Sequence, residues 1–263
     1  MKAIEDMVTK VSADGFNKTQ LNIKEDMERN VFHRDRLAHF FRWAHIMRAM
    51  KPGYSVVDLG CGTGNLATML YANRMKPNPY IGVDIRGKTM DTAEAYFEGR
   101  SFDARFVAGN LCMDGWQEEV LKLMNEHQET TGARPDIITS FEFVEHVPEN
   151  DVEPFLVRVK NIMDKYSSFY LSTPCFDGVR KAENHVKEWY YQELKDLLSK
   201  HFNIENHWGT FISQKDLEPE MNDVFGNAWD RLREYYGSET LAILYAPLFP
   251  SKSRNCIWQL VLK

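Results

Sequence analysis

Three glycines, Gly60, Gly62 and Gly64, lie between a short apolar run and a stretch with helical spacing. Glycines between a strand and a helix permit a tight turn and let backbone N–H groups approach a ligand closely. Asp84 ends the next apolar run, where an acidic side chain can accept hydrogen bonds from both hydroxyls of a ribose. The spacing therefore predicts a nucleotide-type ligand at this turn.

Asp58 stands two positions before Gly60 and restricts the choice of ligand. A dinucleotide is the first alternative, but its GxGxxG/A pattern can be matched only through Gly62, Gly64 and Ala67. A carboxylate at position 58 would repel a pyrophosphate and attract a cationic amine. S-adenosylmethionine carries such an amine, so the turn favours this cofactor over a dinucleotide.

A second group of titratable residues begins where a later apolar run, residues 136–141, ends. Glu142, Glu145 and His146 follow at positions i, i+3 and i+4, and on a helical turn they would share one face. His185 comes after the next apolar run, which ends in Ser-Thr-Pro-Cys. Carboxylates and imidazoles together suit a divalent cation. Without a metal, the same residues could act as a base and as groups that orient it.

Apolar runs alternate with helical stretches between residues 54 and 200, and this order predicts the fold class. Strands separated by helices imply a parallel, doubly wound sheet with right-handed crossovers. We therefore expect an α/β fold with a mostly parallel, seven-stranded sheet. Its strands are predicted at residues 54–59, 80–84, 105–108, 136–141, 168–172, 203–211 and 255–262.

The same pattern divides the chain into three parts. Residues 1–50 are predicted to form an N-terminal arm, at residues 1–22, and a helical cover. Residues 51–211 are predicted to form the cofactor-binding core. Residues 212–263 should carry a helical insertion, with one helix over residues 220–236, and the last strand of the core sheet.

The composition of the 263-residue chain excludes several classes of protein. A net charge of −6 argues against a protein that coats nucleic acid by charge alone, although residues 24–51 lean basic. Four widely spaced cysteines without a CxxC motif indicate a reducing compartment. No targeting or membrane-spanning segment is recognisable, so a cytoplasmic protein that does not act in a membrane is expected.

The glycine-rich turn and the segments after it resemble the class I S-adenosylmethionine-dependent methyltransferases. The resemblance rests on VVDLGCGTG, GVDI, FVAGN and IITSFEFVEHVP, in the family's order, and covers roughly residues 50–211. It implies a Rossmann-like methyltransferase fold in which Asp58 lies near the amino acid part of the cofactor. Asp84 would bind the ribose and Ile85 would pack beside the adenine. The cofactor-binding residues implied in this way are Asp58, Gly60, Cys61, Gly62, Asp84, Ile85, Asn110, Leu111 and Phe141.

The pattern E-x-x-E-H, then S-T-P, then H-x-x-E-W resembles the small-RNA 3′-terminal 2′-O-methyltransferases. The ubiquinone-pathway O-methyltransferases share its first part. In these families such residues hold Mg²⁺ or Mn²⁺, which implies Glu142, Glu145, His146 and His185 as catalytic residues and metal ligands. Many small-molecule methyltransferases have similar segments without a metal, and the two histidines would then shape the floor of the site.

These resemblances together imply O-methylation of a small or nucleotide-like acceptor. Two alternatives stay open: methylation of the 2′-hydroxyl at an RNA 3′ end, or of another nucleic acid, and a non-catalytic module that only binds the cofactor. Cys175 is a further candidate, as a nucleophile of the kind that RNA cytosine-5 methyltransferases use. The simpler interpretation is that Cys175 replaces the asparagine of the segment S-T-P-N in related O- and N-methylating enzymes.

Overall fold

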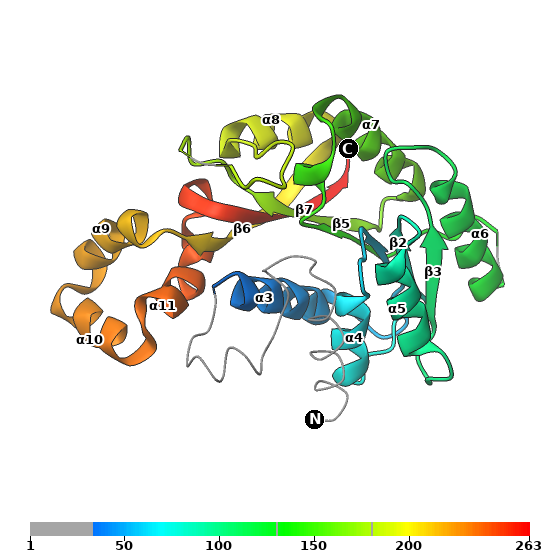
Figure 1. Ribbon diagram of the computed structural model, residues 1–263, viewed down its shortest axis with the longest axis horizontal. Helices are drawn as coiled ribbons and strands as arrows, with labels where there is room; N and C mark the ends of the chain where they lie inside the picture. Colours follow the sequence, from blue (N-terminus) through cyan, green and yellow to red (C-terminus); the bar gives the residue numbers. More distant parts are fainter. Residues whose placement is uncertain (1–33, 130, 180) are drawn as a thin grey trace. The chain divides into compact units, whose positions relative to one another are not determined.

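A seven-stranded sheet in the order β3-β2-β1-β4-β5-β7-β6 carries the residues predicted to act (Figure 1). The computed structural model describes residues 34–129, 131–179 and 181–263. Five strands run parallel, and β7 pairs antiparallel with β5. The predicted fold class is confirmed. The strands are β1 Val56–Leu59, β2 Tyr80–Asp84, β3 Ala104–Ala108, β4 Ile137–Phe141, β5 Ser168–Pro174, β6 Phe202–Ile212 and β7 Ser253–Leu262.

The helices that follow the five parallel strands cover both faces of the sheet, as an alternating pattern requires (Figure 1). They are α4 Asn65–Ala72, α5 Lys88–Phe97, α6 Trp116–Gln128, α7 Glu149–Ile162 and α8 Tyr191–His201. Helix α7 begins at Glu149, three residues before its first apolar side chain, Val152. Its N-cap is Pro148, and Glu149 and Asp151 occupy a first turn where the helix dipole favours acidic side chains.

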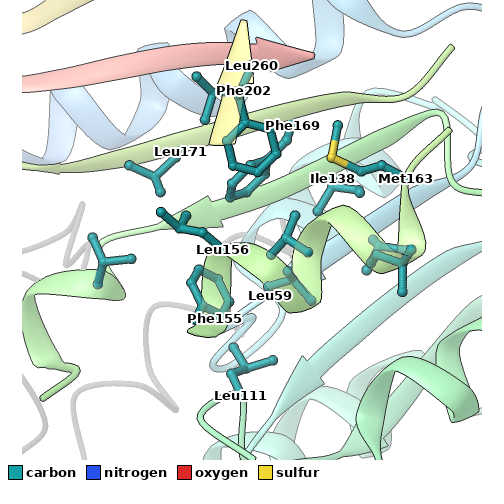
Figure 2. Packing of buried hydrophobic residues seen from close by; sticks show 14 of the residues in the cluster. Leu59, Leu111, Ile138, Phe155, Leu156, Met163, Phe169, Leu171, Phe202 and Leu260 are labelled. Atoms are coloured by element: carbon teal, nitrogen blue, oxygen red, sulfur yellow. The ribbon is translucent and has the colours of Figure 1, made fainter. Parts of the chain in front are cut away.

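Apolar side chains from the sheet and from α6, α7 and α8 pack into one cluster (Figure 2). Strands β1, β2 and β4 are buried almost throughout, which is typical of parallel strands covered on both faces. This cluster holds the carboxyl ends of the strands rigidly, and in such sheets ligands bind beyond those ends. Figure 2 labels Leu59, Leu111, Ile138, Phe155, Leu156, Met163, Phe169, Leu171, Phe202 and Leu260.

The chain divides into two compact units, which are described separately. Among the described residues, one contains Ile46–His207 and Asn255–Lys263, and the other contains 34–45 and Trp208–Arg254. In the second unit, the apolar side chains of Ile212, Leu217, Met221, Trp229, Leu241, Ala242 and Ala246 form a small core. Its helices are α9 Gln214–Phe225, α10 Asn227–Tyr236 and α11 Ser238–Leu244, followed by the 3₁₀ turns η3 Ala246–Leu248 and η4 Pro250–Lys252.

The prediction of one helix over residues 220–236 is wrong. Gly226 separates α9 from α10 with φ 51° and ψ −131°, a conformation that only glycine adopts readily. At the other end of the chain, helix α3 spans Arg34–Ala49 within the predicted helical cover. The predicted arm at residues 1–22 lies outside the described residues. Among the described helices, none combines the length and the apolar character needed to cross a membrane.

Candidate functional site

The glycine-rich turn joins β1 to α4 through backbone conformations that side chains disfavour. Gly60, Gly62 and Gly64 have φ values of 78°, 53° and 73°. The N–H of Gly60 donates to the carbonyl of Val83 at 2.8 Å, which ties the turn to β2. A Cβ atom on Gly60 would lie 3.3 Å from the side chain of Phe143. The turn therefore needs glycine for both its backbone angles and its close packing.

Asp84 closes the turn from the end of β2. One carboxylate oxygen accepts the N–H of Gly62 at 2.7 Å, and the other accepts the N–H of Ile85 at 2.7 Å. Burial raises the pKa of the Asp84 carboxyl. Ile85 follows with 62% of its surface exposed, which provides an apolar face beside the carboxylate. This geometry fits a ribose at Asp84 and an adenine at Ile85, and both assignments stay predictions.

Asp58 lies on β1 and is almost completely buried. Its two carboxylate oxygens accept hydrogen bonds from the hydroxyls of Tyr80 and Thr139, each at 2.7 Å. Burial outweighs these bonds and raises the pKa of Asp58 to about 6. An ionised carboxylate in such a place favours a nearby cation, because opposite charges interact strongly where water is scarce.

The other predicted cofactor residues differ in how far they face solvent. Asn110 is exposed after β3, and its side-chain oxygen accepts the N–H of Cys112 at 2.9 Å. Phe141 is half-buried at the end of β4. Cys61 and Leu111 are buried.

Glu145, His146 and His185 lie close enough together to form a metal site. One potential ligand atom from each lies within 4.8 Å of the other two. Glu145 and His146 belong to the 3₁₀ turn η2, Val144–His146, which follows β4. His185 comes from the loop between β5 and α8. Two imidazoles and one carboxylate form a donor set typical of divalent transition metals such as Mn²⁺ and Fe²⁺.

Hydrogen bonds orient both imidazole rings in this cluster. His146 Nδ1 lies 3.0 Å from the carbonyl oxygen of Asn184, and His185 Nδ1 lies 2.6 Å from Oε1 of Glu188. Both partners are acceptors, so Nδ1 carries the proton and Nε2 is the nitrogen that can bind a metal. Burial lowers the pKa of His146, which favours the neutral imidazole that metal binding requires.

Glu142 lies apart from these three residues. It has φ 54°, unusual for a side chain other than glycine, and it precedes the helical turn instead of starting it. Its carboxylate accepts the hydroxyl of Ser172 at 3.0 Å and the amide of Asn255 at 2.9 and 3.0 Å. The structure therefore brings together three of the four predicted ligands and holds Glu142 beside β5 and β7.

Cys175 is buried, with 5% of its surface exposed. Its side chain hydrogen-bonds with that of Cys256 in the adjacent strand β7. All four cysteines are free thiols. The burial of Cys175 favours a packing role over a nucleophilic one.

Comparison with known proteins identifies the family. The family model described as a methyltransferase domain matches residues 26–224. The chain belongs to the methyltransferase-domain family. The ribosomal protein L11 methyltransferase of Burkholderia lata is 37% identical over 68 residues, which is 26% of this chain. The matched segment spans 22% of that relative's length, so the chain matches only part of it.

Solved structures share the fold of this methyltransferase domain at low sequence identity. The small RNA methyltransferase HEN1 has a TM-score of 0.58 and 17% identity, over 88% of this chain and 26% of that one. Magnesium protoporphyrin IX methyltransferase from Synechocystis, solved with bound S-adenosylhomocysteine, has a TM-score of 0.53 and 14% identity. That match covers 98% of this chain and 94% of the other. Both likenesses support the class I methyltransferase fold.

The site also contains residues that the sequence patterns did not reveal. Tyr80 and Thr139 bind Asp58 from two different strands, and Asn255 binds Glu142 from 113 positions away. No local spacing indicates such pairs, because they depend on strand register. Glu188, in contrast, could have been found from the sequence. It lies three positions after His185, within the H-x-x-E-W segment of this methyltransferase domain.

Proposed function

We propose that the chain transfers the methyl group of S-adenosylmethionine to an oxygen of a small or nucleotide-like acceptor. Asp58, Gly60, Gly62 and Asp84 would hold the cofactor, which supplies an electrophilic methyl group. The observation that carries the proposal is the cluster of Glu145, His146 and His185, because it begins at the carboxyl end of β4, next to β1 and its glycine turn. In a doubly wound sheet this edge faces the ligand crevice.

The acceptor side of the site fits a divalent metal. The donor set is two imidazoles and a carboxylate, and each imidazole has an acceptor on Nδ1. Two nitrogen ligands favour Mn²⁺ over Mg²⁺. A bound metal would lower the pKa of an acceptor hydroxyl. Glu145, His146 and His185 would orient the acceptor, and positioning would account for much of the catalysis.

The same residues also provide a route without a metal. His185 donates through Nδ1 to Glu188, so its Nε2 could accept the proton of an acceptor hydroxyl. His146, whose pKa is lowered by partial burial, could hydrogen-bond the same hydroxyl. The two routes differ in one respect that can be measured, which is their sensitivity to chelators.

RNA is the second candidate acceptor, because HEN1 shares the fold and this chain has the E-x-x-E-H segment. The net charge of −6 weighs against a broad phosphate-binding surface, so a terminal nucleotide is the part of an RNA that would fit best. Periodate oxidation of the terminal diol separates the cases. It should abolish methylation of an RNA 3′ end and leave methylation of internal positions intact.

Cofactor binding is tested by titration calorimetry with S-adenosylhomocysteine. Asp84→Ala should weaken binding at least tenfold, because it removes the carboxylate that the ribose needs. Asp91→Ala is the matched control, since Asp91 is an exposed carboxylate of α5 paired with Arg86. Absence of binding by the wild-type protein would exclude the proposed function.

Transfer itself is tested by a tritiated-methyl screen over extracts fractionated into RNA, DNA, protein and small molecules. Labelling only of protein or DNA would contradict the proposed acceptor class. Once an acceptor is found, EDTA should abolish transfer, and Mn²⁺ or Mg²⁺ should restore it. Turnover that continues in EDTA would exclude the metal and favour the route through His185. Tight cofactor binding without labelling of any fraction would favour a non-catalytic module.

A further inference from the structure

The loop that carries His185 is fastened to the turn that carries the other two cluster residues. The backbone N–H groups of Val186 and Lys187 both donate to the carbonyl of Glu145, at 2.7 and 3.2 Å. Lys181 donates from its side chain to the carbonyls of His185 and Val186. The position of His185 therefore depends on the stability of these few hydrogen bonds to backbone carbonyls.

The side chain of Lys187 anchors this loop to two helices at once. Its ammonium donates to Glu149 at the start of α7 and to Glu193 in the first turn of α8, each at 2.6 Å. It also lies 3.8 Å from the centre of the Trp189 ring. Only 21% of the Lys187 side chain is exposed, whereas the side chains of Glu149 and Glu193 are 62% and 41% exposed, so the ammonium is the shielded partner of each pair.

We propose that Lys187 is a positioning residue for the cluster of Glu145, His146 and His185. Its ammonium holds the 185–187 segment against α7 and α8, which keeps the N–H groups on the carbonyl of Glu145 and the ring of His185 beside that of His146. The two rings are 5.0 Å apart and nearly perpendicular, at 84°. The measurement of metal affinity rests on the proposed function. The ordering of the loop, however, can be measured without a metal.

The test compares Lys187→Met with Lys187→Arg in the full chain. Methionine removes the charge but keeps most of the unbranched side chain, whereas arginine keeps a cation that can bind both carboxylates and stack on the indole. Lys122→Met is the matched control, because Lys122 forms an ordinary exposed pair with Glu119 on α6. The readouts are Mn²⁺ affinity by electron paramagnetic resonance and hydrogen exchange of the Val186 amide. Binding of S-adenosylhomocysteine reports whether each variant keeps its fold.

Lys187→Met should weaken Mn²⁺ binding about tenfold, the size typical of a lost outer contact. It should also speed exchange of the Val186 amide, while Lys187→Arg and the control stay within about threefold of wild type. Unchanged Mn²⁺ affinity together with unchanged exchange would overturn the inference. If the wild type binds no Mn²⁺, the metal part of the proposed function fails, and the exchange result alone decides about Lys187. Should Lys187→Met not fold, Glu149→Gln combined with Glu193→Gln removes the same partners and takes its place.

Discussion

Because the carboxyl group of Asp58 is buried, we predict that a residue that binds the cofactor well at this position makes the folded protein less stable. Burial raises the pKa of Asp58 from 3.8 to about 6, so the ionised form is disfavoured in the folded protein. Asparagine has nearly the same shape and cannot ionise, and the hydroxyls of Tyr80 and Thr139 can rotate to bond it. We therefore expect Asp58→Asn to stabilise the fold while it weakens cofactor binding.

The size of this effect follows from the pKa difference. A rise of about 2 pKa units corresponds to about 3 kcal/mol, since one unit is about 1.4 kcal/mol. The unfolded chain loses the Asp58 proton near pH 4, whereas the folded protein keeps it until about pH 6. Wild-type stability relative to Asp58→Asn should therefore be highest below about pH 4. It should fall as the pH rises to about 7 and stay level above that.

The assay is urea unfolding of both proteins at a series of pH values from about 4 to about 8. The difference in free energy of unfolding isolates Asp58, because His146 and His207, whose pKa values burial lowers, titrate in both proteins. Asp58→Asn should gain about 3 kcal/mol relative to wild type over this range. A difference that does not change with pH would refute the reasoning, and so would a wild type that is the more stable protein at pH 8.

Three further substitutions test other parts of the site. Gly60→Ala should destabilise the fold by about 1–3 kcal/mol in urea unfolding, because its φ is positive and its Cβ would press on Phe143; an unchanged midpoint would contradict this. Asn255→Leu removes an amide from both oxygens of Glu142 and should slow methyl transfer roughly tenfold while S-adenosylhomocysteine affinity is kept. An equal loss of both would indicate a general structural effect instead. Glu188→Gln should weaken Mn²⁺ binding about tenfold by loosening the imidazole it orients, and wild-type affinity would count against that role.

Strands β1, β2, β4 and β5 could be predicted because each is a buried, mainly apolar run between helical stretches. The late helices could not be placed correctly, since the amphipathic pattern runs through Gly226 and hides a break that depends on one backbone conformation. Local spacing identified Glu145 and His146, which are adjacent in the chain. It could not show that Glu142 turns toward Asn255, because that contact is made only when β7 enters the sheet beside β5.

Glu145 connects three parts of the chain through different atoms. Its backbone carbonyl accepts the N–H groups of Val186 and Lys187, and its carboxylate accepts the hydroxyl of Thr173 on β5 at 2.9 Å. The turn after β4, the end of β5 and the loop carrying His185 thus form one hydrogen-bonded unit, which we expect to open cooperatively. A fluctuation that opens this unit removes the carboxylate and both imidazoles together. Loss of the Glu145 contacts should therefore disturb all three groups of the proposed site at once.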